Sequence, residues 1–185
     1  MPFNAWHDVP PGPNPPAELH AIVEIPRGSR NKYELDKTTG LFRFDRLLYS
    51  VVHYPGDYGF IPRTLAEDED PLDVLIMTTE PTFTGCLVPV RPLGVFEMRD
   101  QKGCDEKILA VPLADPLYAE YHGLDDVPSH FLREVEHFFE IYKELEGVTT
   151  SALGWRDIEI ARTIIDEAIR LYREARAAGQ RGASP

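Results

Sequence analysis

Cysteine is scarce in this chain, and long apolar runs are missing. The two cysteines, Cys86 and Cys104, are too few for a disulfide framework and have no CxxC spacing. They are typical of free thiols in a reducing compartment. No segment approaches the roughly 18 consecutive apolar residues that a membrane span needs, and the N-terminus has no basic stretch followed by an apolar one. We therefore expect a cytoplasmic protein with no membrane partner.

Basic residues are also in deficit. The 185 residues include 19 Lys and Arg against 31 Asp and Glu, for a formal net charge of −12. A surface this acidic repels nucleic acid, so we expect no nucleic-acid partner. A small anion can still bind if metal ions and local basic groups reverse the field inside one cleft. The length fits a single domain over residues 1–185 that buries a core.

Proline and hydrophobic periodicity divide the chain into three parts. Six prolines between residues 1 and 16 predict an extended lead-in without a helix. Residues 19–115 are mainly β, with an aromatic turn over 54–60 and a long strand over 86–98 that Pro89 and Pro92 bend or place at an edge. The other predicted strands span residues 21–25, 32–36, 41–46, 73–78 and 107–112.

From Pro128 onward, the spacing of apolar residues changes from that of strands to that of helices. Apolar residues at steps of three and four predict a helix from Pro128 to about Leu145, followed by Gly147. A second helix begins near Asp157 and ends at Gly179, with a tail over residues 180–185. Strands first and helices last indicate the α+β class, with a small closed sheet flanked by two C-terminal helices.

The densest chemical signal is an acidic loop at residues 67–73. Five of these seven residues are carboxylates, and an apolar strand follows at once. A solvated loop is one interpretation. A divalent metal site is the other, since Asp68, Asp70 and Asp73 can converge from a tight turn that Pro71 stiffens, and Mg²⁺ favours carboxylate oxygens. An EF-hand is excluded, because the required Gly and Glu positions are missing.

Other candidates stay ambiguous when each is taken alone. The second acidic cluster, residues 100–107, is either a structural turn or a partner of the first loop. Glu24, inside an apolar strand, faces either solvent or the interior of a closed sheet. Lys32 and Glu34 alternate along one strand and so share a face. Lys143, at the end of the first helix, is either solvated or part of a site.

Taken together, these residues resemble the soluble family I inorganic pyrophosphatases of bacterial type. That family carries an Asp-x-Asp-Pro-x-Asp signature, here residues 68–73, and the resemblance runs from about Val9 to Leu171. It includes Val23-Glu24-Ile25-Pro26, Lys32-Tyr33-Glu34, Asp45-Arg46, Tyr54-Pro55 with Tyr58-Gly59, and His137 to Lys143. The resemblance implies a five-stranded OB-like β-barrel with flanking helices, and an assembly of six identical subunits.

The resemblance also implies a role for each site residue. Asp70 is the implied general base, which deprotonates the attacking water. The implied metal ligands are Asp68, Asp73, Asp100, Asp105 and Glu24. The implied substrate-binding residues are Lys32, Glu34, Arg46, Tyr54, Tyr58, Lys107, Tyr142 and Lys143. About three or four Mg²⁺ ions would neutralise the charge of pyrophosphate during phosphoryl transfer.

Two rival functions remain. One is a Mg²⁺-dependent hydrolase of other polyphosphates or of nucleotides, although the sequence has no P-loop. The other is a non-catalytic OB-like binding module, which would need exposed aromatics in a basic groove. In this chain the basic residues alternate with carboxylates.

Overall fold

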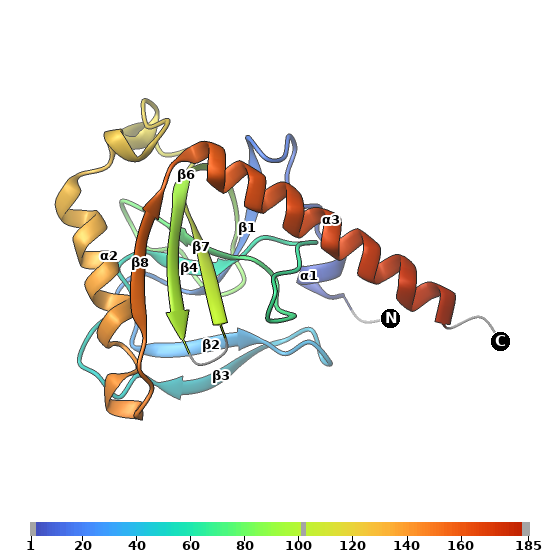
Figure 1. The fold of residues 1–185 in the computed structure, drawn as a ribbon, viewed down its shortest axis with the longest axis horizontal. Helices are drawn as coiled ribbons and strands as arrows, with labels where there is room; N and C mark the ends of the chain where they lie inside the picture. The colour runs from blue at the N-terminus through green and yellow to red at the C-terminus, as the bar shows by residue number, and fades with distance from the viewer. Residues whose placement is uncertain (1–2, 101–102, 183–185) are drawn as a thin grey trace.

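The backbone forms a closed ring of five strands (Figure 1). The computed structural model describes residues 3–100 and 103–182, without the side chains of residues 100 and 180–182. Strands pair in the order β1, β4, β5, β7 and β6, and a further pairing of β6 with β1 closes the ring. The predicted α+β class and five-stranded closed sheet are confirmed. The ring consists of β1 (Leu19–Ile25), β4 (Asp57–Phe60), β5 (Asp73–Ile76), β6 (Leu87–Asp100) and β7 (Gly103–Pro112).

Strand β4 corrects the predicted aromatic turn. Residues 57–60 pair with β1 on one side and with β5 on the other, and all four are buried. Gly59 lies opposite Val23, and a Cβ on Gly59 would overlap the carbonyl oxygen of Ile22. The glycine therefore permits close backbone approach, as predicted, but within a strand and not within a turn.

Strand β6 is bent and is not an edge strand. It pairs with β1 near its start, with β7 along its length and with β8 (Ser151–Arg156) near its end. The bend coincides with a register shift between Pro92 and Gly94 in the pairing with β7. Because proline has no backbone N–H, Pro92 leaves no unpaired donor at this irregularity. Strand β8 lies between the two long helices, so the prediction that all strands precede the helices is wrong. β8 is short and contains Gly154, so its sequence shows little of the alternation of apolar and polar residues that would predict a strand.

The predicted hairpin is present as β2 (Asn31–Leu35) and β3 (Phe42–Leu47). Figure 1 shows it running crosswise to β6 and β7. The turn between its strands is held by Asp36, whose Oδ1 accepts hydrogen bonds from the backbone nitrogens of Thr38 at 3.0 Å and Thr39 at 2.8 Å. This is a side-chain cap of the kind that favours aspartate in turns.

Both long helices are present, with different ends. Helix α2 (Ser129–Ile141) stops before Leu145, which is 67% exposed and not on the buried face as predicted. Helix α3 (Ile158–Gly182) is capped by Asp157 but continues past Gly179. A glycine inside a helix costs only about 1 kcal/mol, so it does not end a helix by itself. None of the helices described here is long and apolar enough to cross a membrane.

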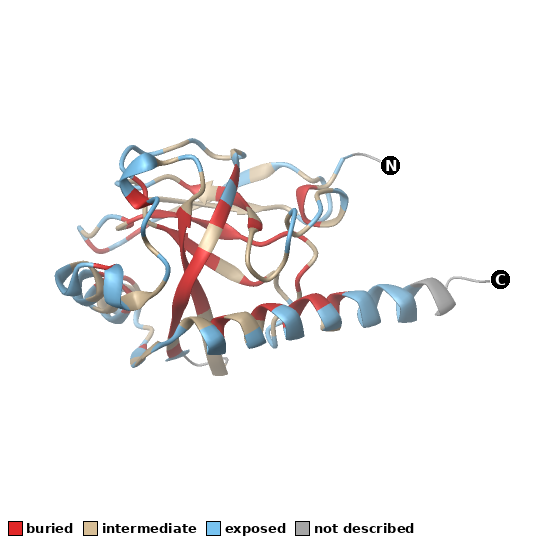
Figure 2. Ribbon diagram, turned by 90° about the horizontal axis from the view of Figure 1, so that it is seen from above, coloured by how far each residue is buried: buried red, intermediate tan, exposed pale blue. Residues whose placement is uncertain are grey.

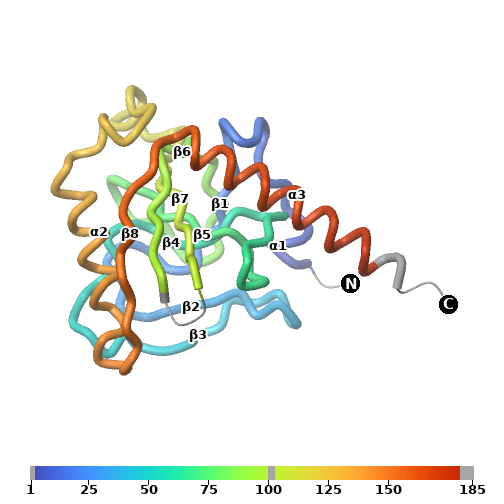
Figure 3. The backbone as a smooth tube through the Cα atoms, in the orientation of Figure 1, coloured from blue at the N-terminus to red at the C-terminus, as the bar shows by residue number. Residues whose placement is uncertain are grey.

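The N-terminal lead-in is not wholly extended. Residues Ala5–Asp8 form the short helix α1, because the Asn4 side chain accepts a hydrogen bond from the Trp6 backbone nitrogen at 3.0 Å. Trp6 is 8% exposed, and it packs with Phe60 and Tyr172. His7 Nδ1 lies 2.9 Å from the Tyr172 hydroxyl, so α1 contacts α3. Figure 3 shows the N-terminal segment on the same side of the molecule as the end of α3.

The core lies on both faces of the ring strands. Val74 and Ile76 pack in the same cluster as Ile165 of α3, whereas Leu75 packs in the cluster that includes Phe139 of α2. Figure 2 shows buried residues along the strands and on the side of α3 that faces them. Two-sided burial explains why these strands are continuous apolar runs in the sequence.

The close approach at Gly59 predicts a specific loss of stability. Gly59→Ala should lower the free energy of unfolding by about 2–4 kcal/mol, because the methyl group forces β4 away from β1. Gly123→Ala is the matched control, since a Cβ on Gly123 meets nothing within 4 Å. Urea denaturation measures both. Equal stabilities for the two variants would show that the close approach is wrong.

Candidate active site

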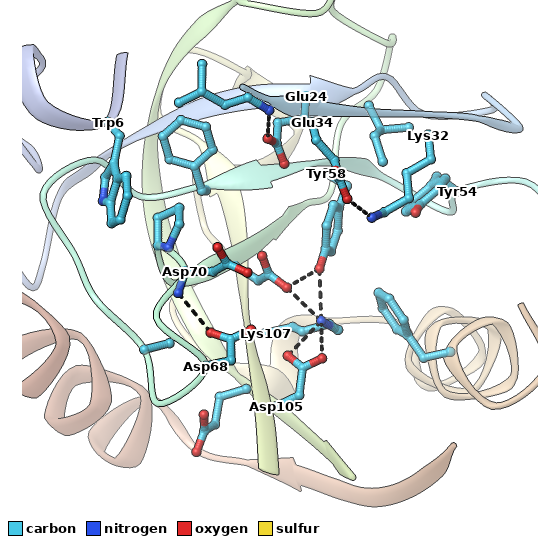
Figure 4. Close-up of a pocket in the computed structure, with 18 of the residues that line it drawn as sticks. Trp6, Glu24, Lys32, Glu34, Tyr54, Tyr58, Asp68, Asp70, Asp105 and Lys107 are labelled. Carbon is cyan, nitrogen blue, oxygen red and sulfur yellow. Dashed lines mark hydrogen bonds and ion pairs between the residues drawn. The ribbon is translucent and has the colours of Figure 1, made fainter. Parts of the chain in front are cut away.

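A cavity of about 270 Å³ lies where β1, β2, β4, β5 and β7 meet the end of α2. Figure 4 shows its acidic and basic side chains pointing toward one another from these elements. Twelve of the predicted site residues line it. They are Glu24, Lys32, Glu34, Tyr54, Tyr58, Asp68, Asp70, Asp73, Asp105, Lys107, Tyr142 and Lys143. The two clusters of carboxylates do face one cavity, as predicted.

Strand register brings the two carboxylate clusters together. β5 and β7 run parallel, and Asp73, the first residue of β5, is paired with Lys107 of β7. Asp105 precedes Lys107 by two positions, so the two share a face of the strand. A single ladder therefore places Asp73, Asp105 and Lys107 side by side.

Lys107 is the centre of this group. Its Nζ donates to Asp73 Oδ2 at 2.7 Å and to Asp105 at 2.8 and 3.0 Å. It also donates to the Tyr58 hydroxyl at 2.9 Å, and that hydroxyl donates in turn to Asp73. The faces of Tyr58 and Phe139 lie beside the ammonium, with ring centroids 5.4 and 5.1 Å away. The contacts satisfy a cation that is only 2% exposed.

Burial and the neighbouring carboxylates have opposing effects on the pKa of Lys107 and concerted effects on the pKa of Tyr58. Burial disfavours the ammonium form of Lys107, but the carboxylates of Asp73 and Asp105 outweigh burial and raise the pKa of Lys107. Burial also raises the pKa of the Tyr58 hydroxyl, and Asp73 and Asp105 raise it further. Lys107 is therefore a permanent cation, and Tyr58 keeps the proton that it donates.

The acidic loop folds as a tight turn. Asp68 Oδ1 accepts from the Asp70 backbone nitrogen at 3.1 Å, and the Asp70 carbonyl accepts from the Ala66 nitrogen at 2.8 Å. Glu69 between them has a φ of 67°, a left-handed conformation that is rare for glutamate. The turn directs Asp68 and Asp70 to the cavity wall. Glu67 also lines the cavity.

Glu24 faces the cavity and not the solvent. Its Oε1 accepts a hydrogen bond from the Leu35 backbone nitrogen at 2.7 Å, which ties β1 to the hairpin. Burial raises the pKa of Glu24 to about 8, against the opposing effect of that hydrogen bond. Lys32 and Glu34 share a face, as predicted, and form an ion pair.

Of the remaining predicted residues, Arg46 lies outside the cavity lining and Asp100 has no described side chain. Arg46 is bound to Asp45 at 2.5 Å and to Glu146 at 2.8 Å, which turns its guanidinium toward the segment after α2. It is absent from the cavity lining. Asp100 ends β6 opposite Gly103, but its side chain lies outside the described part of the chain.

Several further cavity residues were missed, and two of them, Lys37 and Trp6, lie against each other. Lys37, in the turn of the hairpin, forms an ion pair with Asp70, and its Nζ lies 5.2 Å from the centroid of the Trp6 ring. Trp6 itself lines the cavity. Neither residue carries a sequence signal, because both reach the acidic loop only through the three-dimensional fold.

This geometry is matched by comparisons with known proteins. The family model described as inorganic pyrophosphatase matches residues 21–173. The chain belongs to the inorganic pyrophosphatase family. The inorganic pyrophosphatase of Haloferax volcanii is 46% identical over 172 residues, covering 92% of this chain and 97% of that protein. The inorganic pyrophosphatase of Methanosarcina mazei is 52% identical over 153 residues, covering 83% of this chain and 90% of that protein.

Solved structures of the inorganic pyrophosphatase family share the fold as well. The crystal structure of inorganic pyrophosphatase from Thermus thermophilus matches with a TM-score of 0.90 at 41% identity, covering 92% of this chain and 99% of that one. The resemblance that the acidic signature predicted is therefore confirmed, both as a family and as a fold.

A pyrophosphatase site needs metal, and the donor chemistry suits one. Asp68, Asp73 and Asp105 bring carboxylate oxygens, which Mg²⁺ prefers, to one cavity. Within residues 3–99 and 103–179, however, no three acidic, His or Cys side chains form a ready-made metal cage. The ammonium of Lys107 lies between Asp73 and Asp105 and donates hydrogen bonds to both. The carboxylate oxygens are therefore of the type that Mg²⁺ prefers, and Lys107 is the counter-ion of Asp73 and Asp105 in this structure.

The central ion group predicts a strong effect of removing its cation. Lys107→Met should lower the free energy of unfolding of the metal-free protein by about 3 kcal/mol, because two carboxylates are left without a counter-ion. The control is Arg162→Met, which breaks an exposed ion pair with Glu159 and should cost less than about 1 kcal/mol. Urea denaturation measures both, and similar losses would contradict the role of Lys107.

The raised pKa of Glu24 predicts a pH dependence of stability. Between about 4.5 and about 8 the folded protein binds a proton that the unfolded chain has lost, so stability falls as pH rises through this window. Gln at position 24 has no such proton and keeps an oxygen for the Leu35 hydrogen bond. Without metal, Glu24→Gln should match the wild type near pH 5 and exceed it by on the order of 3 kcal/mol near pH 9. A difference independent of pH in urea denaturation would refute this.

Proposed function

We propose that the protein hydrolyses inorganic pyrophosphate to two phosphate ions, with Mg²⁺ as cofactor and Asp70 as general base. The observation that supports this best is the meeting of two charge sets in one cavity. Carboxylates suited to metal line it together with the cations Lys32, Lys107 and Lys143, which suit phosphate oxygens. Family membership over residues 21–173 supports the same reaction.

Asp70 is suited to accept the proton of the attacking water. Its carboxylate is at the cavity wall, it is held by the tight turn at Glu69, and it pairs with Lys37. A carboxylate fixed in this way can orient a water molecule and remove its proton as the bond to phosphorus forms. The oxygen of the water then belongs to one phosphate, and the bridging oxygen leaves with the other.

Cationic and hydroxyl groups hold the substrate oxygens. Lys32 and Lys143 line the cavity from the hairpin and from the end of α2. Tyr54 and Tyr142 add hydroxyl donors, and Tyr58 would join them once its proton is released from Asp73. Burial raises the pKa of Tyr54 and Tyr58, so both stay protonated. Phosphoryl transfer depends mainly on such positioning and charge neutralisation.

Asp68, Asp73 and Asp105 would hold Mg²⁺, with Asp100 and Glu24 as further ligands. Bound Mg²⁺ supplies positive charge against the pyrophosphate and lowers the pKa of nearby water. We propose about three or four ions per site, the number that the resemblance to the family implies, to neutralise the charge of pyrophosphate. Arg46 would join the substrate ligands only if it gives up Glu146, to which it is bound at 2.8 Å.

The setting of the enzyme is part of the proposal. The free cysteines, Cys86 and Cys104, favour a reducing compartment such as the cytoplasm. Exposed apolar side chains on the hairpin and after it, among them Phe44, Tyr49 and Val51, suit contacts with further copies of the chain. We propose a homohexamer, which gel filtration tests directly.

The base assignment predicts a large kinetic effect. With Mg²⁺ and pyrophosphate, Asp70→Asn should lower kcat about 10²- to 10⁴-fold, because the amide cannot accept the proton. Glu69→Gln is the matched control in the same loop, since it removes one charge beside Asp70 and should keep wild-type activity. Phosphate release measures both. Near-normal kcat in Asp70→Asn would remove Asp70 from the role of base.

A further inference from the structure

Lys37 lies against Asp70 at the cavity wall. Its Nζ forms an ion pair with Asp70 Oδ1 and donates to the Glu69 carbonyl oxygen at 3.2 Å. It therefore contacts both the carboxylate of the candidate base and the backbone of the strained residue before it. Lys37 and Asp70 are 33 positions apart, on the hairpin turn and the acidic loop, so this contact joins two separate segments.

Trp6 holds Lys37 from the other side. The indole ring lies 5.2 Å from Lys37 Nζ, within the range of a cation–π contact. The ring is itself fixed, because its Nε1 donates to the Thr64 carbonyl oxygen at 2.8 Å in a buried contact. The Thr64 hydroxyl accepts from the Leu72 nitrogen at 2.9 Å, which continues the link into the acidic loop.

The N-terminal segment also contacts the hairpin turn. Asn4 Nδ2 donates to the Lys37 carbonyl oxygen at 3.4 Å. A Cβ on Gly40 would overlap the Phe3 carbonyl oxygen, so the turn packs directly on this segment. The backbone nitrogen of Arg63 donates to the Trp6 carbonyl oxygen at 2.9 Å. Residues 3–8 therefore connect the turn that bears Lys37 to the segment that leads into the acidic loop.

We propose that Lys37 is a positioning residue that holds the Asp70 carboxylate in its catalytic orientation, and that Trp6 of the N-terminal segment holds Lys37 in place. This rests on the proposed function, in which Asp70 accepts a proton from water. A direct role of Lys37 in binding phosphate is the alternative. The existing contacts of the ammonium with Asp70, Glu69 and Trp6 favour positioning, because a phosphate ligand would have to give them up.

Kinetics separate these two roles. Lys37→Met should lower kcat for pyrophosphate about tenfold to hundredfold while KM changes less than about threefold, because an interaction with the base is lost and not one with the substrate. Lys37→Arg should restore most of kcat. Arg162→Met, which removes an equally exposed cation paired with Glu159, should leave both constants unchanged.

A double-mutant cycle then tests whether Lys37 acts through Asp70. Adding Lys37→Met to Asp70→Asn should lower kcat by less than about twofold, since the group that Lys37 positions is already inactive. A full additive loss in the double variant would overturn the proposal. So would a large rise in KM with unchanged kcat for Lys37→Met alone.

Fluorescence of the metal-free protein tests the contact without any activity. The chain has two tryptophans, so Trp155→Phe leaves Trp6 as the reporter. In this background Asp70→Asn should change the Trp6 emission by releasing Lys37 from its place beside the ring. The same change should have no effect once Lys37→Met has removed the ammonium. Equal responses with and without Lys37 would overturn the link.

The two proposals can fail separately. If the wild type with Mg²⁺ releases no phosphate from pyrophosphate, the proposed function is wrong, and the fluorescence cycle still decides whether Lys37 connects Trp6 to Asp70. If the wild type is active but the cycle shows no coupling, the reaction stands and the positioning role of Lys37 is wrong.

Discussion

A buried ammonium group constrains everything around it. Lys107 is 2% exposed, and its charge is stable there because Asp73, Asp105 and the Tyr58 hydroxyl surround it. The dependence is mutual, since the two carboxylates would repel each other without the ammonium. The ammonium therefore holds the two carboxylates together, and it explains why strongly charged residues can line a cavity in an otherwise apolar ring. If Asp73 and Asp105 bind metal as proposed, that metal would share both carboxylates with Lys107 and would compete with this ion group.

The topology creates that arrangement. The parallel pairing of β5 with β7 places Asp73 beside Lys107, and burial of both faces of these strands keeps the register fixed. The hairpin brings Lys32 and Glu34, and the end of α2 brings Tyr142 and Lys143. The N-terminal segment adds Trp6 and, through it, Lys37. Segments between residues 6 and 143 thus meet at one cavity, so the site forms only when the ring is closed.

The sequence predicts local features well and distant contacts poorly. The acidic loop is visible because Asp68, Asp70 and Asp73 are close together in the chain, and the closed sheet follows from short strands and a recognisable family signature. Strand β8 and the continuation of α3 past Gly179 escape prediction, because pairing with β6 and helical hydrogen bonds outweigh weak local signals. The places of Arg46, Lys37 and Trp6 depend on partners far away in the sequence, such as Glu146 and Asp70. No local pattern encodes such pairs.

Pyrophosphate hydrolysis in ¹⁸O-enriched water tests the central claim most directly, because it reports both cleavage and the source of the new oxygen. With purified wild-type protein and Mg²⁺, the account predicts rapid release of phosphate that carries oxygen from the water, and no release when the divalent metal is chelated. Intact pyrophosphate after incubation with Mg²⁺, or phosphate release that persists at full rate without divalent metal, would contradict it.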